Sequence, residues 1–426
     1  MLCREIILNF YPMKLSELKN KRILILGFGR EGRDTYAFLK KEGLGSVIGI
    51  ADKRENIEKE DATMHLGSSY MKAITEYDII IRSPGIPLNN IQEYLTEKQT
   101  LISQTEIFFS NMKGSIIGIT GTKGKSTTAS LIYEVLKKEG MQVHLIGNIG
   151  KPVLEFLDNN STDDVFVYEL SSFQLAALNT SPHIAVVLNL YEEHLDWHGN
   201  LEEYIKAKTN ITRFQRADDY LVFNKEDDKV KAIADGSKAQ KIGFKENRGK
   251  NMAASKEPVL LVAKLFGIPQ KTAEKTIQEF KGLEHRLQKV GTYNGITFYN
   301  DSLATIPEAT IAALDILGKD VQTLIAGGLD RGISYEKLGK RIQNSEIKTL
   351  ILFPETGKKI LQAINNPAFK HIFVDTMQEA LNAAFVETEN GKICLLSPAS
   401  SSFNLFKDYE DRGNQFIKYA KEDPLS

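Results

Sequence analysis

Residues 115–128 read SIIGITGTKGKSTT, and this stretch decides the fold of the central part of the chain. Its first six residues form a short apolar run, which is typical of a strand buried in a parallel sheet. A loop with Gly121 and Gly124 follows, and a helix-favouring run begins at Ser126. This order predicts a loop whose backbone N–H groups surround phosphate oxygens, helped by the positive end of the helix dipole.

Two side chains of this loop add specific chemistry. Lys125 is placed to reach the β- and γ-phosphates of a nucleotide, and the hydroxyl of Ser126 is placed to bind Mg²⁺. The segment from Gly121 to Lys125 is shorter than in the usual phosphate-loop pattern, which indicates a particular subclass rather than a generic nucleotide hydrolase. The alternative is an ordinary Gly/Ser/Thr turn in front of a capped helix.

Length and composition are those of an ordinary globular protein. The chain has 426 residues, which predicts about two to four domains. Hydrophobic residues make up 42% and charged residues 26%, so a disordered or fibrous protein is excluded. The formal net charge of -1 argues against a protein that binds nucleic acid or a membrane surface along its whole length.

The expected location is the cytoplasm. Cys3 and Cys394 cannot supply a disulfide framework or a four-thiolate zinc site, and they suit a reducing compartment. No apolar run reaches the roughly 20 residues that span a bilayer, and the N-terminus does not resemble a signal peptide. We therefore expect no membrane partner. Met13 begins a stretch typical of a protein start, so residues 1–12 are interpreted as an upstream extension.

Strand-like apolar runs alternate with helical segments along the chain, which predicts an α/β protein with doubly wound parallel sheets. Residues 224–256 are weakly patterned and are interpreted as short strands or a loop. The predicted strands are residues 22–27, 47–51, 78–82, 115–120, 165–170, 184–190, 296–300, 323–326, 349–353, 371–374 and 392–396.

The N-terminal stretch carries a second glycine pattern. Gly27, Gly29 and Gly32 follow a predicted strand and precede a predicted helix, and Asp52 lies at the end of the next strand. This is the pattern of a dinucleotide-binding fold, so a nicotinamide-dependent oxidoreductase is one alternative. Such an enzyme would leave the phosphate loop at residues 120–128 unexplained.

Motifs along nearly the whole chain resemble those of the Mur ligases, the enzymes that add amino acids to the peptidoglycan precursor. Within that family the motifs are most similar to those of the glutamate-adding branch. They occur in the family's order: TGTKGKSTT at residues 120–128, NIG at 148–150, ELSSFQL at 169–175, NLYEEHLD at 189–196, YIKAK at 204–208, GLEHR at 282–286, NDS at 300–302, GG at 327–328 and SPA at 397–399.

The resemblance implies an α/β fold with three domains. These are a Rossmann-like N-terminal domain that binds the UDP substrate (1–113), a central P-loop-type ATPase domain with a parallel sheet (114–285) and a C-terminal Rossmann-like domain that binds the amino acid (286–426). ATP would phosphorylate the carboxylate of UDP-N-acetylmuramoyl-L-alanine, and the amine of glutamate would attack the acyl phosphate. The implied cofactor is Mg²⁺, as two ions, and the implied enzyme is a cytoplasmic monomer without a nucleic-acid partner.

The resemblance also assigns roles to individual residues. Lys125, His194 and Lys208 are the predicted catalytic residues, and Lys208 is predicted to be carbamylated by CO₂. The predicted metal ligands are Ser126, Glu169, His194 and Lys208. The predicted ATP-binding residues are Gly121, Thr122, Lys123, Gly124, Lys125, Ser126, Thr127, Arg286 and Asp301.

Two further sets concern the other substrates. The predicted UDP-substrate-binding residues are Gly29, Arg30, Asp52, Ser83, Pro84, Gly85, Asn148 and Ser171. The predicted amino-acid-binding residues are Thr305, Arg331, Ser402, Phe403 and Tyr409.

Some of these residues have a simpler interpretation when they are taken alone. His194 would suit an aromatic surface cluster with Trp197 and His198, and Lys208 would suit the solvated face of a helix. Glu169 would suit a surface charge, although the carboxyl end of a parallel strand is where α/β proteins place their sites.

The sequence departs from the pattern of the branch that adds D-glutamate at three positions. Leu303 replaces a lysine that holds the amino-acid carboxylate, Glu193 replaces an aspartate before His194, and Ala254 stands near Asn251 where a second asparagine is expected. These three departures bear on the second substrate, the metal site and the adenine contacts.

The enantiomer of glutamate is therefore left open at this point. The strings GREG at residues 29–32 and DSLAT at 301–305 resemble a branch that adds L-glutamate. D-Glutamate is the common substrate of the family, and L-glutamate is the alternative. A folylpolyglutamate synthetase shares the ATP loop, but it normally begins with its ATPase domain, whereas about 110 residues precede the loop here.

Overall fold

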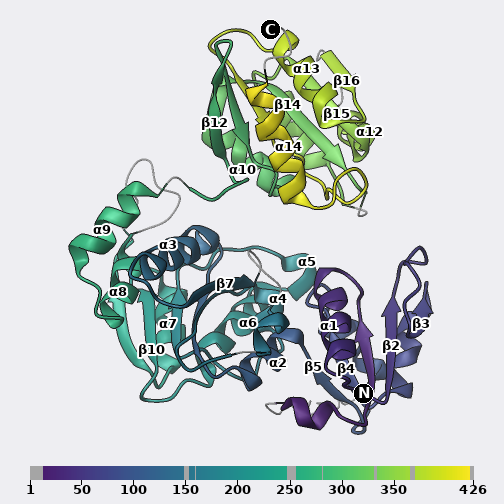
Figure 1. Ribbon diagram of the computed structural model, residues 1–426, viewed down its shortest axis with the longest axis vertical. Helices are drawn as coiled ribbons and strands as arrows, with labels where there is room; N and C mark the ends of the chain where they lie inside the picture. Colours follow the sequence, from purple (N-terminus) through teal and green to yellow (C-terminus); the bar gives the residue numbers. More distant parts are fainter. Residues whose placement is uncertain are drawn as a thin grey trace. The chain divides into compact units, whose positions relative to one another are not determined.

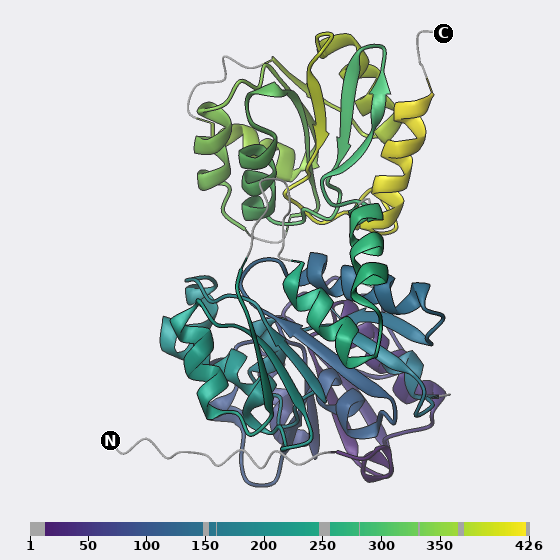
Figure 2. The ribbon, with the colours of Figure 1, turned by 90° about the vertical axis from the view of Figure 1, so that its left-hand side faces the viewer.

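The structure is a computed structural model that describes residues 13–147, 153–158, 160–246, 256–280, 282–330, 333–364 and 370–422. It contains two compact units, Met1–Phe280 and Lys281–Ser426, and each is described by itself (Figures 1 and 2). The proposed extension at residues 1–12 lies outside the described residues. No helix in the ranges given is long and apolar enough to cross a membrane.

The first unit begins with a five-stranded parallel sheet in the order β3-β2-β1-β4-β5. The chain moves outward from β1 to β3 and then crosses to β4 on the other side, which is the doubly wound arrangement. The elements are β1 (Arg22–Leu26), α1 (Arg30–Lys41), β2 (Val47–Asp52), β3 (Thr63–Leu66), β4 (Ile79–Arg82), β5 (Thr100–Ile102) and α2 (Gln104–Asn111).

The same unit contains a six-stranded parallel sheet in the order β11-β10-β9-β6-β8-β7. Its strands are β6 (Ser115–Thr120), β7 (Val143–Gly147), β8 (Val165–Glu169), β9 (Ile184–Val187), β10 (Tyr220–Asn224) and β11 (Gln240–Phe244). Its helices are α3 (Lys125–Lys138), α4 (Ser172–Leu175), α5 (Leu195–His198), α6 (Leu201–Arg213), α7 (Asp228–Gly236), α8 (Glu257–Leu265) and α9 (Gln270–Glu279). Helices α8 and α9 pack on α3 (Figure 1).

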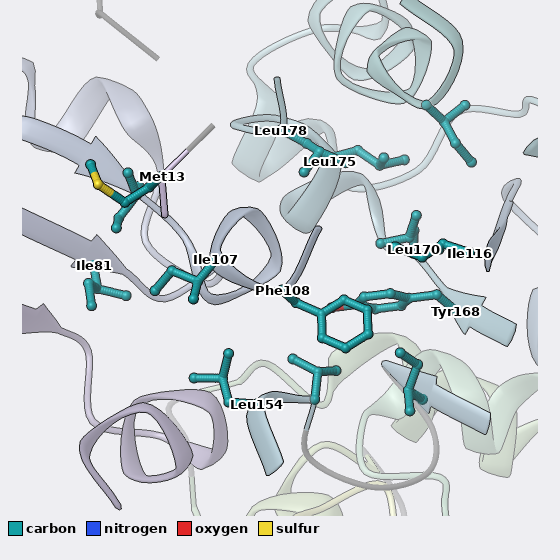
Figure 3. Packing of buried hydrophobic residues seen from close by; sticks show 14 of the residues in the cluster. Met13, Ile81, Ile107, Phe108, Ile116, Leu154, Tyr168, Leu170, Leu175 and Leu178 are labelled. Atoms are coloured by element: carbon teal, nitrogen blue, oxygen red, sulfur yellow. The ribbon is translucent and has the colours of Figure 1, made fainter. Parts of the chain in front are cut away.

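One hydrophobic core joins these two sheets. The ring of Phe108 in α2 lies 5.7 Å from that of Tyr168 in β8 (Figure 3). It also lies 5.3 Å from the ring of Phe166 in the same strand. All three side chains are fully buried, and burial of such a ring stabilises the fold by about 1.5–3 kcal/mol. The cluster continues from Met13 to Ala239, which explains why both sheets form one compact unit.

The second unit has a six-stranded sheet in the order β12-β13-β17-β14-β15-β16, parallel except for the β12–β13 pair. Helix α14 packs beside β12 and β13 (Figure 2). The strands are β12 (Gln288–Tyr293), β13 (Ile296–Asn300), β14 (Val321–Gly328), β15 (Thr349–Glu355), β16 (Lys370–Phe373) and β17 (Ile393–Leu396). The helices are α10 (Pro307–Leu317), α11 (Glu336–Gln343), α12 (Thr356–Gln362), α13 (Met377–Glu387) and α14 (Tyr409–Lys421).

Short 3₁₀ helices connect several of these elements. They are η1 (Leu15–Leu18), η2 (Tyr70–Glu76), η3 (Leu88–Asn90), η4 (Gln92–Tyr94), η5 (Leu154–Leu157) and η6 (Gly318–Asp320).

The predicted α/β class with mostly parallel sheets is confirmed. All eleven predicted strands are present, because strands that are buried on both faces read as continuous apolar runs. The segment 224–256 differs from its interpretation, since it contains the helix α7 as well as β11. The three-domain division at residues 113 and 285 stays a prediction.

Candidate active site

The phosphate loop lies at the carboxyl edge of the second sheet, between two other loops. β6 pairs with β8 on one side, where Ile119 is opposite Glu169, and with β9 on the other, where Thr120 is opposite Val187. Because all three strands are parallel, the loop after β6 lies between Glu169 and the segment that follows β9. After β6 the chain first adds strands on the β8 side and then adds strands on the β9 side. α/β proteins bind ligands at the point where the order of strands reverses in this way.

Two glycines give this loop its shape. Gly121 has a φ of 155° and Gly124 a φ of 86°, which L side chains rarely adopt. A Cβ atom on Gly121 would also lie 2.9 Å from the Cβ atom of Leu188. Gly124 is the N-cap of α3, so the N–H groups of the first helical turn, which have no acceptor within the helix, lie next to the loop.

Asn189 fixes the loop from the side of β9. Its backbone oxygen accepts from the N–H of Thr122 at 2.8 Å, and its Oδ1 accepts from the N–H of Lys123 at 2.8 Å. Its Nδ2 donates to the carbonyl of Lys123 at 3.1 Å. Asn189 begins the NLYEEHLD motif but was not among the predicted site residues, and its place at the start of that motif was the available signal.

The two lysines of the loop have different surroundings. Lys125 Nζ donates to the carbonyl oxygens of Gly121 at 2.9 Å and Thr122 at 3.0 Å, so it lies over the loop. Lys123 is exposed, and its Nζ lies 3.0 Å from Oε1 of Glu193. Exposed ion pairs of this kind contribute about 0–1 kcal/mol, so a ligand can displace the pair at little cost.

Lys208 of α6 is not the solvated helix lysine that its sequence alone would suggest. Its side chain is buried, and Nζ donates to Oγ1 of Thr120 at 3.1 Å and to the carbonyl of Gly121 at 3.0 Å. Burial, and next the charge of Lys125, lower the pKa of Lys208 well below its usual value, although Glu193 and Glu169 oppose this shift.

Tyr204 lies one helical turn before Lys208 and supports both the loop and the lysine. Its hydroxyl is 2.9 Å from Oγ1 of Thr122, and its ring lies 5.0 Å from Nζ of Lys208. Burial raises the pKa of Tyr204 to about 12, so the phenol stays protonated. Sequence reasoning missed this residue, although the four-residue spacing places both side chains on one helix face.

Glu169 ends β8 as a buried carboxylate. Its Oε2 has no hydrogen-bond partner among the residues that the structure describes, which is costly unless a cation or a water binds there. The described ranges contain no group of three or more His, Cys, Asp or Glu side chains that could hold a metal. One carboxylate, hydroxyl groups, phosphates and water are the mode in which proteins hold Mg²⁺, so these residues fit that ion.

His194 has a strained backbone next to the loop. Its φ is 58° and its ψ is 34°, a left-handed conformation that costs a non-glycine residue about 1–3 kcal/mol. Its ring lies 4.8 Å from that of Phe173, and its Nε2 lies 3.7 Å from Oε2 of Glu193. The predicted aromatic cluster with Trp197 and His198 is also present, since both rings contact Phe173.

The predicted UDP-binding turns lie together at the carboxyl edge of the first sheet. Oγ of Ser83 donates to the carbonyl of Gly27 at 2.7 Å, which joins the turn after β4 to the turn after β1. Among the residues that the structure describes, a Cβ atom on Gly29 or Gly85 would meet nothing within 4 Å, which leaves open space over both turns. Arg30 begins α1, whose N-terminus suits a diphosphate.

Buried Arg82 holds the Ser83-Pro84-Gly85 turn from below. Its Nη1 donates to the carbonyl oxygens of Pro84 at 3.3 Å and Ile86 at 2.5 Å. Burial lowers the pKa of Arg82 to about 10, so the guanidinium remains charged at neutral pH. Sequence reasoning missed this role, because a strand-ending arginine gives no sign of where its head lies.

Asp52 is fully engaged with protein groups. Its Oδ2 accepts from the N–H of Phe28 at 2.7 Å and from Nη2 of Arg54 at 2.9 Å, and its Oδ1 accepts from Nε of Arg54 at 2.9 Å. Burial by itself raises the pKa of Asp52. The hydrogen bonds from Arg54 and Phe28 together outweigh burial, so the pKa of Asp52 lies below its ordinary value. The structure thus adds Arg54, whose side chain is 57% exposed, to the residues at this edge.

The second unit brings several C-terminal predictions to one sheet edge, after β13 and β17. Asp301 Oδ2 accepts from Oγ of Ser397 at 2.7 Å, and Oδ1 accepts from the N–H of Leu287 at 3.1 Å. Burial raises the pKa of Asp301 to about 7. The two hydrogen bonds and the charge of Arg286 act in the opposite direction, but their effect is smaller than that of burial.

Arg412 joins the two loops of this edge and was missed by sequence reasoning. Its side chain is buried, with Nε and Nη2 donating to the hydroxyl and carbonyl of Ser302 at 3.0 and 2.8 Å and Nη1 donating to the carbonyl of Ser400 at 3.0 Å. The carbonyl of Tyr409 accepts from Oγ of Ser302 at 2.8 Å.

The remaining predicted residues have varied surroundings. Ser402 is buried, Phe403 is 65% exposed, and Thr305 and Leu303 are half-buried near the end of β13. Ser126 is buried and Thr127 is half-buried in the first turn of α3. Asn148, Arg331, Asn251 and Ala254 lie outside the described residues.

Comparison with known proteins gives consistent relationships along the chain. The model of the Mur ligase middle domain matches residues 119–291, and the model of the Mur ligase glutamate ligase domain matches residues 285–400. The UDP-N-acetylmuramoylalanine--D-glutamate ligase of Streptococcus sanguinis (strain SK36) is 32% identical over 96% of this chain and 99% of its own. The enzyme of that name from Listeria monocytogenes (strain EGD-e) is 34% identical over 95% and 97%.

Solved structures share the fold at low sequence identity. UDP-N-acetylmuramate-alanine ligase MurC from Thermotoga maritima is 16% identical, with a TM-score of 0.54 over 94% of this chain and 99% of its own. MurF ligase from T. maritima, in complex with ADP, is 15% identical, with a TM-score of 0.52 over 96% of each chain. E. coli FolC is 14% identical, with a TM-score of 0.54 over 80% of this chain and 100% of its own.

The matched domains cover more than half of the chain, and the relatives align with nearly all of it. The membership that the motifs predicted is therefore confirmed: this chain belongs to the Mur ligase family.

Proposed function

We propose that this protein is an ATP-dependent ligase that joins D-glutamate to UDP-N-acetylmuramoyl-L-alanine. The observation that carries the proposal is the match over at least 94% of the chain to relatives named as D-glutamate ligases. The first sheet takes part in this match, which favours a UDP-sugar substrate over a folate and over a nicotinamide cofactor. The phosphate loop supports ATP as the source of energy.

The reaction has two steps. A carboxylate oxygen of the UDP substrate attacks the γ-phosphorus of ATP, the bond to the β–γ bridging oxygen breaks, and ADP leaves. The nitrogen of glutamate then attacks the acyl carbon, phosphate leaves, and the amine loses a proton. Two anions meet in the first step and repel by about 4 kcal/mol at 4 Å in an effective dielectric of 20. The site must therefore supply positive charge.

The phosphate loop supplies that charge. Lys125 has only to swing from the carbonyls of Gly121 and Thr122 to the phosphates, and Lys123 has to leave Glu193. The N–H groups at the start of α3 add further donors. Such preorganised groups act on the transferred phosphoryl group without reorganisation, which is how phosphoryl transfer is accelerated.

We propose that Ser126, Glu169, His194 and carbamylated Lys208 hold two Mg²⁺ ions. The unpartnered Oε2 of Glu169 and the low pKa of Lys208 support this proposal. Bound Mg²⁺ supplies neutralisation of the phosphate oxygens. Glu193, which replaces the usual aspartate, lies near His194 and is able to reach the same region.

The residues proposed to bind the substrates belong to both units. Gly29, Arg30, Ser83, Pro84, Gly85, Asn148 and Ser171 bind the UDP substrate, together with Asp52 acting through Arg54. Arg286 and Asp301 bind ATP, and Thr305, Arg331, Ser402, Phe403 and Tyr409 bind glutamate. A monomer in the cytoplasm suffices, since one chain carries every residue named.

The amino acid is the decisive test. Purified enzyme with Mg²⁺-ATP and UDP-N-acetylmuramoyl-L-alanine is expected to release phosphate with D-glutamate and to give little release with L-glutamate. The product is identified by mass spectrometry, and omission of the UDP substrate is the control. Release with L-glutamate alone would replace the D-enantiomer by the alternative that Leu303 and the DSLAT string raise. Release with neither enantiomer would contradict the proposed function.

A further inference from the structure

Glu31, in the first turn of α1, lies beside the turn proposed to bind the diphosphate. Its neighbours Gly29 and Arg30 belong to that turn, and a Cβ atom on Gly32 would lie 2.1 Å from the carbonyl oxygen of Gly27. The backbone around Glu31 is therefore closely packed against the turn. The carbonyl of Glu31 also accepts from Oγ1 of Thr35 at 2.7 Å and from Nε2 of Gln104 at 3.2 Å, which leaves little freedom at this position.

The side chain of Glu31 reaches the second sheet region through Gln174. Nε2 of Gln174 donates to Oε1 of Glu31 at 3.0 Å. The other end of the same amide, Oε1, accepts from the N–H and the Oγ of Ser171, both at 3.0 Å. Ser171 follows the metal-site residue Glu169 by two positions. A continuous chain of hydrogen bonds thus joins the diphosphate turn to the turn after β8.

The second oxygen of Glu31 has no partner in the part of the chain that the structure describes. Oε2 is buried and makes no hydrogen bond, and Nε of buried Arg82 is in the same situation. The charged and titratable groups that face Glu31 are Arg30 and Asp34 on α1, Arg82 on β4 and Tyr168 on β8. Gln174 therefore fixes Oε1 of Glu31, and Oε2 is the oxygen that can take up or release a proton without breaking a hydrogen bond to the described residues.

The surroundings of Glu31 place its loss or uptake of a proton near neutral pH. Burial raises the pKa of Glu31 to about 7, and the hydrogen bond from Gln174 and the charges of Arg30 and Arg82 reduce the rise. A diphosphate at the start of α1 brings negative charge close to this carboxyl group. Nearby negative charge favours the neutral form of an acid, so the bound substrate raises the pKa further.

We propose that Glu31 is a positioning residue that couples the UDP-binding turn to the Ser171 turn through Gln174, and that it takes up a proton when the UDP substrate binds. The protonated form removes a negative charge from beside the diphosphate and keeps Oε1 as the acceptor for Gln174. This inference rests on the proposed function, since it assumes that the diphosphate lies at the start of α1.

Proton uptake is measured directly by calorimetry. UDP-N-acetylmuramoyl-L-alanine is titrated into the full chain at pH 7.5 in buffers of different ionisation enthalpy, because its diphosphate and carboxylate do not titrate near this pH. A rise of one pH unit in the pKa of Glu31 corresponds to an uptake of about half a proton. Glu31→Gln is expected to bind the substrate without proton uptake, since its amide still accepts from Gln174 but does not titrate.

Kinetics provides a second readout that a merely structural role would not change. The KM for the UDP substrate is expected to rise by up to about ten-fold between pH 6.5 and 8.5 in the wild-type enzyme and to stay flat in Glu31→Gln. Glu31→Ala, which breaks the chain of hydrogen bonds, is expected to raise that KM and lower kcat at every pH. The matched control is Glu106→Gln, because Glu106 is another buried acid with a pKa of about 7, on α2, outside the proposed site.

The outcomes separate the inference from the function on which it rests. A wild-type enzyme that does not bind UDP-N-acetylmuramoyl-L-alanine contradicts the proposed function itself. Binding without proton uptake, or a Glu31→Gln variant with the wild-type KM profile, overturns the role of Glu31 and leaves the function intact. A Glu31→Ala variant that loses thermal stability without any change in KM or kcat would show a purely structural residue.

Discussion

Lys125→Ala is expected to lower the rate of ATP-dependent phosphate release by at least about a hundred-fold, the loss typical of removing one preorganised group from a charged transition state. Lys125 is the cation that lies over the phosphate loop, within hydrogen-bonding distance of the carbonyls of Gly121 and Thr122. The effect should appear in kcat more than in the KM for ATP, because the lysine acts most strongly where charge develops on the transferred group.

The fold should survive this change. Lys125 is the first residue of α3, and alanine is the best helix former, so the helix should form as before. The measurement is a phosphate-release assay with thermal unfolding as the check on folding. Lys137→Ala, in the last turn of the same helix, is the matched control and should leave activity unchanged. A Lys125→Ala enzyme with wild-type kcat would remove the basis for the phosphate-loop assignment.

Local patterns made the fold and the loop predictable. Strands β6, β8 and β14 are buried on both faces, so each reads as an apolar run whatever its neighbours are. The positive φ angles of Gly121 and Gly124 restrict these positions to glycine, so the loop is visible in the sequence as well. Strands β3, β5, β7, β10 and β12 were not predicted. The half-buried residues of the short edge strand β3 give no continuous apolar run, but β10 does contain one and was overlooked.

Contacts between distant parts of the chain were not predictable in the same way. Asn189 holds the phosphate loop through three hydrogen bonds, and Gln174 joins Glu31 to Ser171, yet each is one polar residue among many in the sequence. Arg412 is similar, since its burial under Ser302 follows only from the packing of α14. Such roles depend on tertiary neighbours that neither periodicity nor spacing reveals.

Asp52 illustrates how a correct pattern left its chemistry undetermined. The glycine pattern and the acid at the end of β2 predicted a nucleotide contact, as in dinucleotide folds. In the structure, both carboxylate oxygens already accept hydrogen bonds from Phe28 and Arg54. The acid thus orients a guanidinium group at this edge, and the sequence alone could not distinguish direct contact from this indirect role.

Lys208→Met is the second change with a large expected effect, and at least about a hundred-fold loss of kcat should result. The proposed reason is chemical. The neutral amine adds to CO₂ and releases a proton, which converts a base into a carbamate anion with two oxygens. A lysine that stayed protonated would not react in this way, and burial lowers the pKa of Lys208 well below its usual value. Burial therefore favours the neutral amine, which is the form that reacts with CO₂.

The design separates carbamylation from other roles of this lysine. Methionine is unbranched, similar in length and uncharged, so it suits the buried position and the fold should be retained. Lys206→Ala, which changes an exposed lysine on the same helix that pairs with Glu203, is the matched control and should keep wild-type activity. Wild-type enzyme in ¹³C-bicarbonate should show a carbamate carbon signal by NMR that Lys208→Met lacks, and CO₂-depleted buffer should lower activity until bicarbonate is restored.

These readouts discriminate between the free amine and the carbamate as the working form of Lys208. In the structure the amine donates to Oγ1 of Thr120 and to the carbonyl of Gly121, the residues that begin the phosphate loop. If the free amine were the working form, these contacts would suffice, activity would not depend on CO₂, and no carbamate signal would appear. If the carbamate is the working form, the new anion needs cations. Lys125, whose charge acts on Lys208, would supply one, and a metal ion held by Glu169 would supply another, since Oε2 of Glu169 has no hydrogen-bond partner in the described ranges.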